Sequence, residues 1–421
     1  MNLPLFEYLS LIQQSLQKQG LDGWLLYDFR AINPVMLQLL SIPKEQKLTR
    51  RLYVWVPAQG LPVLLRHQIE HSSVASQEIV FSSLGPSQVQ LYSDHRQLSQ
   101  KLDELLKDAK KIAMEVSFQG KLPYLSCVDL GTVQAVESRG IEVCSSAAVA
   151  ANVLARWDQE GLDSHLRAAR ALEEEVSHCW RWIHEALCQG RLLNEYQIQQ
   201  HLQQQLENRG MKLSDPAIIA INAASADAHY VPTVSLHQEL EPNQVLLIDV
   251  WCKENKPLAR YADICRMAFT GSKPTALHHS VFEAVKDAQQ AVFKRLQEPL
   301  QDIKGCDLDK IARASIEKTG FGSFFIHRLG HSIDLQCHGS GTHLDDYETC
   351  DDRPIVSRTC FSVEPGIYLE GQFGVRLESD VYVDSLGKCH VTGGMQTSWQ
   401  LLDPSMSAPH CLSTSPLSIT L

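Results

Sequence analysis

The chain has 421 residues, of which 44% are hydrophobic and 21% charged, so it is long enough for two domains with full hydrophobic cores. Its 38 basic and 49 acidic residues give a formal net charge of −11, which argues against nucleic acid or an anionic membrane as the main partner. The 12 cysteines include no CxxC pair, so we expect reduced thiols in a cytoplasmic protein rather than a disulfide framework.

The first 155 residues are predicted to form a small α/β domain, because short helical and strand-like patterns alternate along them. We expect no signal peptide, since the N-terminus lacks a basic segment and Glu7 comes early. The longest apolar run, near 147–155, is too short to span a bilayer. The patterns predict a helix over 5–19, strands over 23–29 and 110–116, a hairpin of 50–56 with 62–69, and a helix over 96–109.

Residues 156–402 show a different sequence pattern from the first domain, with long amphipathic helices that alternate with strand-rich segments. Asn194 is placed to cap a helix that ends at Gly210. The other expected elements are a helix over 158–188, strands over 217–222, 245–251 and 261–269, and helices over 278–297 and 307–319. This order predicts an α+β domain around a curved antiparallel sheet. Residues 403–421 are rich in Ser and Pro, so we expect a flexible tail.

Charged residues interrupt several strand-like apolar runs of the second domain, where an unpaired charge is costly to bury. Asp249 lies in VLLIDVW and Asp263 in RYADICRM, while Glu364 and Glu378 interrupt CFSVEPGIYL and GVRLESDVYV. These four carboxylates would repel one another without a cation among them. His331 of HRLGHSIDLQCHG adds an imidazole to the set. The pattern therefore predicts a buried centre that holds one or two divalent metal ions.

The donor types of this centre indicate its chemistry. Carboxylates with a single imidazole suit a hard or borderline ion, with Mn²⁺ as the leading expectation and Co²⁺ or Zn²⁺ as alternatives. Two ions bridged by carboxylates would hold a water, lower its pKa and polarise a carbonyl oxygen during hydrolysis. His229, His327 and His338 would then contact the substrate. Arg376 shares a strand face with Glu378, so it would orient or neutralise that carboxylate.

The order of these five acidic and histidine residues resembles the ligand signature of the pita-bread dinuclear metallopeptidases, a family that includes methionine aminopeptidase, aminopeptidase P and prolidase. Three further motifs resemble the aminopeptidase P and prolidase branch, namely His229–Tyr230, His327-x3-His331-x6-His338 and Arg376-x-Glu378. The resemblance covers about residues 160–400 and implies a pita-bread fold. Residues 1–150 resemble the creatinase-type N-terminal domain that this branch carries.

The resemblance implies a role for each metal ligand. Asp249 would hold one metal ion, and Asp263 and Glu378 would bridge both ions. His331 and Glu364 would complete the coordination of the second ion. Glu364 would also act as the general base on the water that bridges the ions.

The resemblance also implies an activity, which is hydrolysis of the bond between an N-terminal residue and proline by a metal-bridging hydroxide. His229 and His338 would position the scissile peptide and stabilise its oxyanion, while His327 and Arg376 would line the pocket for the prolyl residue. A prolidase that cleaves only Xaa-Pro dipeptides is the alternative, and the branch implies a homodimer. A creatinase-like enzyme without metal, or a non-catalytic peptide-binding homologue, would be expected to lose ligand positions that this chain keeps.

Several positions depart from the family pattern. Thirteen residues separate the two aspartates where ten are usual, which predicts a longer hairpin loop. Cys265 replaces a hydroxyl residue and is expected to be an inert filler, with a redox-sensitive thiol as the alternative. Asp334 replaces a usual glycine, and His338 is followed by neither the usual acidic residue nor proline. The acidic loop over 339–353 is expected to be a solvated rim, with an altered reach for the substrate as the alternative.

Overall fold

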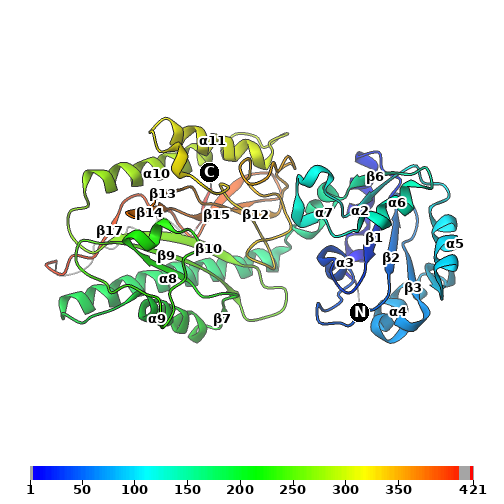
Figure 1. The fold of residues 1–421 in the computed structure, drawn as a ribbon, viewed down its shortest axis with the longest axis horizontal. Helices are drawn as coiled ribbons and strands as arrows, with labels where there is room; N and C mark the ends of the chain where they lie inside the picture. The colour runs from blue at the N-terminus through cyan, green and yellow to red at the C-terminus, as the bar shows by residue number, and fades with distance from the viewer. Residues whose placement is uncertain (1–2, 407–417, 421) are drawn as a thin grey trace. The chain divides into compact units, whose positions relative to one another are not determined.

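The structure is a computed structural model that describes residues 3–406 and 418–420. The chain divides after Leu154 into two compact units, an N-terminal one and a larger C-terminal one (Figure 1). Within the described ranges, no helix is long and apolar enough to cross a membrane.

The N-terminal unit is an α/β fold around one mixed sheet with the order β4-β3-β2-β1-β5-β6. β1 to β2 and β2 to β3 pair antiparallel, which confirms the predicted hairpin, and the remaining neighbours pair parallel. The strands are β1 (Gly23–Asp28), β2 (Leu52–Pro57), β3 (Val63–His67), β4 (Val89–Tyr92), β5 (Lys111–Met114) and β6 (Glu142–Ser145). The helices are α1 (Pro4–Glu7), α2 (Leu9–Lys18), α3 (Pro34–Leu39), α4 (Ala75–Ser83), α5 (His95–Leu106), α6 (Leu130–Glu137) and α7 (Ala147–Leu154).

Both faces of this sheet carry an apolar core, because successive side chains of a strand point to opposite faces. Along β1, Trp24 and Leu26 join the core under the first helices, while Leu25 and Tyr27 join the opposite one. The single helix predicted over 5–19 is wrong in one respect. It is broken at Tyr8, whose φ of −98° and ψ of 4° lie outside the helical range.

Glu115 is a fully buried carboxyl group that ties three segments of the N-terminal unit together. It accepts hydrogen bonds from Trp24 Nε1 at 2.5 Å, Asn33 Nδ2 at 2.7 Å and Ser146 Oγ at 3.0 Å. Asn33 in turn caps α3 through its side-chain oxygen. Burial nevertheless raises the pKa of Glu115 from its ordinary value of 4.5 to about 7, against the lowering effect of these donors.

This raised pKa predicts a pH-dependent stability. The folded chain holds the Glu115 proton to a higher pH than the unfolded chain does, so this contribution is complete below about pH 4.5 and is lost as the pH rises through 7. The loss is on the order of 3 kcal/mol. Urea unfolding at pH 5 and pH 8 should therefore show a smaller pH effect for Glu115→Gln than for wild type. The exposed Glu104→Gln variant should behave like wild type, and an unchanged pH effect in Glu115→Gln would contradict the prediction.

The C-terminal unit is an α+β fold in which helices cover strands from two sides, with α8 and α9 on one side and α10 and α11 on the other (Figure 1). The helices are α8 (Gln159–Cys188), α9 (Glu195–Asn208), α10 (Ala276–Leu296) and α11 (Gly305–Glu317). Asp158 caps α8, and Asn194 caps α9 in a capping box with Gln197, as its position in the sequence predicted.

The strands of this unit form two larger sheets and a hairpin, and all neighbouring strands pair antiparallel except β10 and β17, which pair parallel. One sheet has the order β17-β10-β9-β7 with β8 also on β9, another has the order β11-β12-β15-β16-β18, and β13 pairs with β14. The first set comprises β7 (Met211–Lys212), β8 (Ile218–Ile221), β9 (Val245–Glu254), β10 (Ala262–Phe269) and β17 (Gln400–Leu401). The others are β11 (Ser332–Ile333), β12 (Thr359–Val363), β13 (Gly366–Leu369), β14 (Phe373–Arg376), β15 (Ser379–Val383), β16 (Cys389–Thr392) and β18 (Ser418–Thr420).

The predicted tail contains β18, which pairs with β16 although its Ser/Pro-rich surroundings give no strand pattern. Residues 407–417 and 421 of that segment lie outside the described residues.

Side-chain alternation along β9 directs its charged residue inward. Leu246, Ile248 and Val250 pack in the core that includes α8 and α9. Leu247 lies on the other face, in the core that includes α10 and α11, and Asp249 follows it on that face. The alternation therefore places the carboxylate of Asp249 inside the C-terminal unit, on the face of β9 that is turned towards α10 and α11.

Candidate metal centre

Three of the predicted acidic residues lie side by side because of strand register. Cys265 of β10 is directly opposite Asp249 of β9, and on its other side it forms an antiparallel bridge with Glu378. Asp263 precedes Cys265 by two positions, so its side chain lies on the same face of β10. The bridge between Cys265 and Glu378 joins the two larger sheets, and the carboxylates gather at that junction.

His331 and Glu364 reach the same place from the second sheet. His331 immediately precedes β11 and Glu364 immediately follows β12, and these strands pair antiparallel. The Nε2 atom of His331 lies 3.4 Å from Glu364 Oε1, 3.7 Å from Asp263 Oδ2 and 4.0 Å from Glu378 Oε1. Its Nδ1 atom faces the Ser332 carbonyl oxygen at 3.3 Å. An imidazole held in this way presents Nε2 to the carboxylates, as a metal-binding histidine does.

The buried oxygens of this cluster fit a divalent cation. Asp249 Oδ1, Asp263 Oδ1 and Glu378 Oε1 are buried and have no hydrogen-bond partner among the described residues. Ligand atoms of Asp249, Asp263 and Glu378 lie within 4.8 Å of one another, as do those of His331, Glu364 and Glu378. Buried carboxylate oxygens without donors are costly unless a cation neutralises them, and carboxylate with imidazole is a metal-binding donor set.

The titration behaviour of the cluster agrees with this crowding of negative charge. Burial, followed by the charges of neighbouring carboxylates, raises the pKa of Asp263 and Glu378 well above their ordinary values. Burial also raises the pKa of Glu364 to about 7, while the Arg376 guanidinium opposes this shift. Burial lowers the pKa of His331 well below its ordinary value, so its imidazole is neutral and can act as a ligand.

Arg376 neutralises a different carboxylate from the predicted one. Its Nη2 atom pairs with Asp249 Oδ2, and its Nη1 atom donates to the Tyr368 hydroxyl at 2.8 Å. The expectation that it pairs with Glu378 is wrong, because Arg376 ends β14 and the bridge to Cys265 turns Glu378 towards the sheet junction. His327 Nε2 also contacts the Tyr368 hydroxyl at 2.8 Å. Tyr368 thus links the two residues that were predicted to bind substrate.

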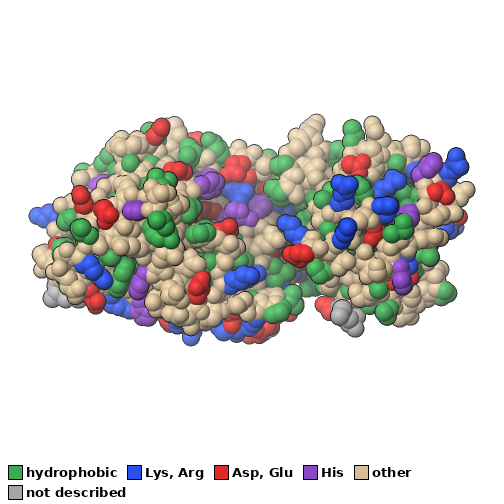
Figure 2. Space-filling model, turned by 60° about the horizontal axis from the view of Figure 1, so that its bottom comes forward, with side chains coloured by type: hydrophobic (Ala, Val, Ile, Leu, Met, Phe, Trp, Pro, Cys, Tyr) green, Lys and Arg blue, Asp and Glu red, His purple; other side chains and the backbone are tan. Residues whose placement is uncertain are grey.

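The other two predicted substrate histidines lie at the surface of the centre. The rings of His338 and His331 meet edge to face with centroids 4.3 Å apart, and burial, then the charges of Arg328 and His229, lower the pKa of His338. His229 is exposed, and its backbone N–H donates to Asp227 Oδ1 at 3.0 Å. Figure 2 shows histidine side chains near acidic and basic ones on the visible face of the larger unit. His229 and His338 are both exposed residues, so their rings are accessible to a bound peptide.

Two departures from the family pattern compensate each other in the turn 334–340. Asp334 is buried and accepts hydrogen bonds from the backbone N–H of Gln336 at 3.0 Å and of Ser340 at 2.8 Å. A Cβ atom added at Gly339 would lie 2.7 Å from the Asp334 carboxyl carbon and 3.0 Å from its backbone nitrogen. The aspartate in place of a usual glycine therefore requires a glycine after His338, where an acidic residue is usual.

This steric coupling predicts a non-additive pair of substitutions. We expect Gly339→Ala to lower the free energy of unfolding by about 1–3 kcal/mol, because the new methyl group meets Asp334. In an Asp334→Gly background the same change should cost about 1 kcal/mol less. Urea unfolding of wild type, Gly339→Ala, Asp334→Gly and the double variant measures this coupling. Asp346→Gly, from the neighbouring acidic loop, serves as the control background. Additive costs within about 0.3 kcal/mol would contradict it.

The acidic loop after His338 is partly a buried structure, so the expectation of a solvated rim is wrong for its central aspartates. Asp345 is fully buried and accepts hydrogen bonds from the backbone N–H groups of Tyr347, Glu348 and Thr349. Asp351, also fully buried, pairs with Arg353 at 2.6 Å. These aspartates satisfy backbone donors and a buried guanidinium, which is why burial does not leave their charges uncompensated.

Two cysteines adjoin the centre in different ways. Cys265 is fully buried, and burial raises the pKa of its thiol well above the ordinary value, which favours the inert filler that the sequence predicted. Cys337 was not singled out from the sequence, yet its Sγ atom donates to Asp263 Oδ2 at 3.0 Å. Asp380 was also missed, and its Oδ2 atom accepts from the Asp263 backbone N–H at 2.9 Å.

The chain is similar to known peptidases over its C-terminal unit. Residues 163–385 match metallopeptidase family M24. An Xaa-Pro dipeptidase of Lactobacillus delbrueckii subsp. lactis is 28% identical over 216 residues, which are 51% of this chain and 55% of the relative. The chain thus spans about half the length of the curated relatives it matches.

Solved structures resemble the chain over nearly its whole length. The dipeptidase PepE of Mycobacterium ulcerans has a TM-score of 0.69 at 19% identity, with 94% of this chain and 97% of that one covered. An X-prolyl aminopeptidase of Caenorhabditis elegans, described as a cytosolic enzyme with a di-nuclear active site, has a TM-score of 0.63 at 16% identity and covers 90% of this chain and 60% of its own. The chain belongs to metallopeptidase family M24, and its C-terminal unit has the pita-bread fold.

Proposed function

We propose that the protein is a metal-dependent exopeptidase that hydrolyses the bond between an N-terminal residue and proline. The observation that carries this proposal is the set of buried, unpaired carboxylate oxygens gathered around the neutral imidazole of His331. A creatinase-like or purely peptide-binding relative would have no use for a complete cluster of this kind, and the similarity to an Xaa-Pro dipeptidase supports the substrate class.

The metal requirement is two divalent ions. Asp249 would hold one ion, Asp263 and Glu378 would bridge both, and His331 and Glu364 would complete the second, in keeping with the overlapping groups that these atoms form. The first ion would have carboxylate oxygens as its only protein ligands, which suits Mn²⁺, with Co²⁺ or Zn²⁺ as alternatives. When bound, the ions would supply a nucleophile at neutral pH and polarise the scissile carbonyl.

The side chains around the ligands would perform the remaining steps. Glu364 would accept the proton of the attacking water and later pass it to the leaving proline nitrogen, since its Oε1 atom lies among the ligand atoms, 3.4 Å from His331 Nε2. His229 and His338 would hold the scissile peptide and stabilise its oxyanion. His327 and Arg376 would line the pocket for the prolyl residue, where the Tyr368 hydroxyl fixes both of them.

A panel of peptides distinguishes the two forms of this activity. An Xaa-Pro aminopeptidase cleaves Xaa-Pro-Xaa tripeptides, whereas a prolidase acts only on Xaa-Pro dipeptides. We expect hydrolysis of both by the metal-loaded chain, with an Ala-Ala dipeptide as the control that should remain intact. Cleavage of dipeptides alone would establish the prolidase, and cleavage of neither proline peptide would reject the proposal.

The cellular setting is part of the same proposal. A cytoplasmic location fits the described cysteines, all of which are free thiols. A proline-containing peptide is the expected partner, and a homodimer is expected from the resemblance to the branch. Sedimentation equilibrium of the full chain measures the oligomeric state, and a monomer at micromolar concentration would contradict the dimer.

A further inference from the structure

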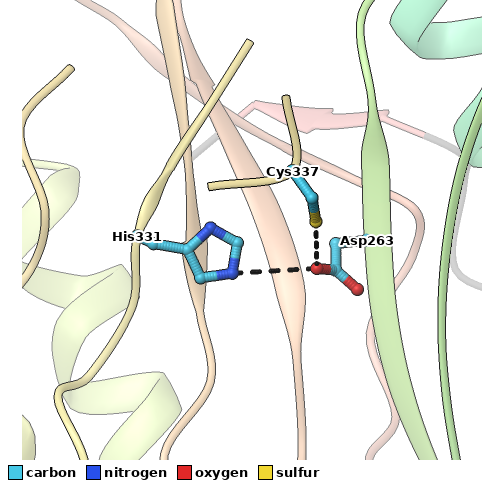
Figure 3. A group of neighbouring side chains, drawn as sticks. All are labelled: Asp263, His331 and Cys337. Carbon is cyan, nitrogen blue, oxygen red and sulfur yellow. Dashed lines mark hydrogen bonds and ion pairs between the residues drawn. The ribbon is translucent and has the colours of Figure 1, made fainter. Parts of the chain in front are cut away.

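We propose that Cys337 is a thiolate ligand of the ion held by His331, an inference that rests on the metal centre proposed above. Its Sγ atom lies 3.0 Å from Asp263 Oδ2, and that same oxygen lies 3.7 Å from His331 Nε2 (Figure 3). In Figure 3 the His331 imidazole and the Cys337 thiol both point to the same carboxylate oxygen of Asp263. The sulfur is therefore placed among atoms already assigned to metal binding.

The spacing of the three donor atoms fits shared coordination. Sγ of Cys337, the Asp263 carboxylate and His331 nitrogen lie within 4.8 Å of one another. Zn–S bonds of about 2.3 Å and Zn–O or Zn–N bonds of about 2.1 Å put neighbouring tetrahedral donors roughly 3.6 Å apart. Asp263 is only 4% exposed, and its other oxygen, Oδ1, has no hydrogen-bond partner among the described residues, so this buried carboxylate is incompletely satisfied without a cation.

The turn 334–340 holds the thiol in place. Besides the two hydrogen bonds to Asp334, the Gly339 backbone N–H donates to the Ser332 carbonyl oxygen at 2.6 Å. Lys253 Nζ donates to the Leu335 carbonyl oxygen at 2.7 Å. Cys337 thus lies in a closed turn that hydrogen bonds with Ser332 of β11 and Lys253 of β9 hold in place, and its partly buried thiol faces Asp263.

Coordination changes the bonding of Cys337 in a balanced way. The S–H bond breaks, its proton leaves to solvent, and a sulfur lone pair forms the bond to the divalent ion, with no change in oxidation state. The hydrogen bond from Cys337 to Asp263 is then replaced by a shared cation. Thiolate ligands favour Zn²⁺ or Co²⁺ over Mn²⁺. The two metal positions consequently differ, one with oxygen donors only and the other with imidazole and thiolate.

Cobalt titration of the metal-free, full-length protein tests this ligand. We expect Co²⁺ to produce a sulfur-to-cobalt charge-transfer band that is absent in Cys337→Ser, while Cys337→Ser still binds two ions. We also expect Cys337→Ser to bind Zn²⁺ more than about tenfold more weakly at one position in chelator competition. Loss of a residue that only hydrogen-bonds to a ligand already lowers metal affinity about 10- to 100-fold. Mn²⁺ affinity should change little.

Cys350→Ser is the matched control, because Cys306, Asp346 and Cys350 form another group that could hold the ion. A band lost in Cys350→Ser but kept in Cys337→Ser would overturn the inference. Stoichiometric Co²⁺ binding without any charge-transfer band would also overturn it, yet leave the metal centre standing. Failure to bind Co²⁺ at all would instead reject the proposed function on which the inference rests.

Discussion

Replacing Glu364 by glutamine is expected to lower kcat on an Xaa-Pro peptide by about 10²–10⁴-fold while most of the metal stays bound. The amide oxygen can still ligate a cation, but the amide cannot accept the proton of the attacking water. The position supports this role, since Glu364 Oε1 lies 3.4 Å from His331 Nε2 and accepts a hydrogen bond from Ser362 Oγ at 3.2 Å. Steady-state kinetics paired with metal analysis of the same sample measures both effects.

The exposed Glu370→Gln variant, six residues along the chain, is the matched control and should keep wild-type activity. Turnover near the wild-type value in Glu364→Gln would remove this residue as the base. Loss of metal in proportion to loss of turnover would leave it as a ligand only. The two roles are therefore separable in one pair of measurements.

The second large effect is expected for His331→Ala, which should retain about one ion per chain and lose activity at least about 100-fold. The His331 imidazole faces three of the carboxylates, so its removal leaves the second metal position with oxygen donors that repel one another. Loss of a residue that hydrogen-bonds to a metal ligand already lowers metal affinity or activity about 10- to 100-fold. Loss of the ligand itself should lower them further.

His390→Ala is a suitable control, because His390 lies on β16 of the same sheet and pairs at 2.9 Å with Asp384, which follows β15. That variant should keep two ions and full activity. Two tightly bound ions in His331→Ala would refute the ligand role of His331. An intact fold in both variants, checked by urea unfolding, ensures that metal loss reflects the site.

Local signals made the helices of the C-terminal unit predictable. Asp158 and Asn194 cap α8 and α9 within the chain segment itself, so the starts of these helices could be read from neighbouring residues. The break at Tyr8 and the strand β18 could not be read in this way. A break depends on how the flanking helices pack, and β18 depends on a free edge of β16 that is distant in the sequence.

The five metal-binding candidates were predictable for a related reason, because a charge inside an apolar strand is visible in the sequence. Their convergence rests on the bridge of Cys265 to Glu378, which joins two sheets and leaves no local pattern. Tyr368 was missed because a tyrosine in an apolar run looks like an ordinary core residue, and Cys337 was missed because a single cysteine between polar residues has no ligand spacing of its own. Their importance lies in partners far along the chain, namely Asp263 and Arg376.

Metal titration of the metal-free chain, followed by hydrolysis of an Xaa-Pro peptide, tests the central claim most directly. The buried oxygens of Asp249, Asp263 and Glu378 predict no turnover without metal and an activity that saturates at two divalent ions per chain. A chain that binds no stoichiometric Mn²⁺, Co²⁺ or Zn²⁺, or that binds them and leaves every proline peptide intact, would contradict this account.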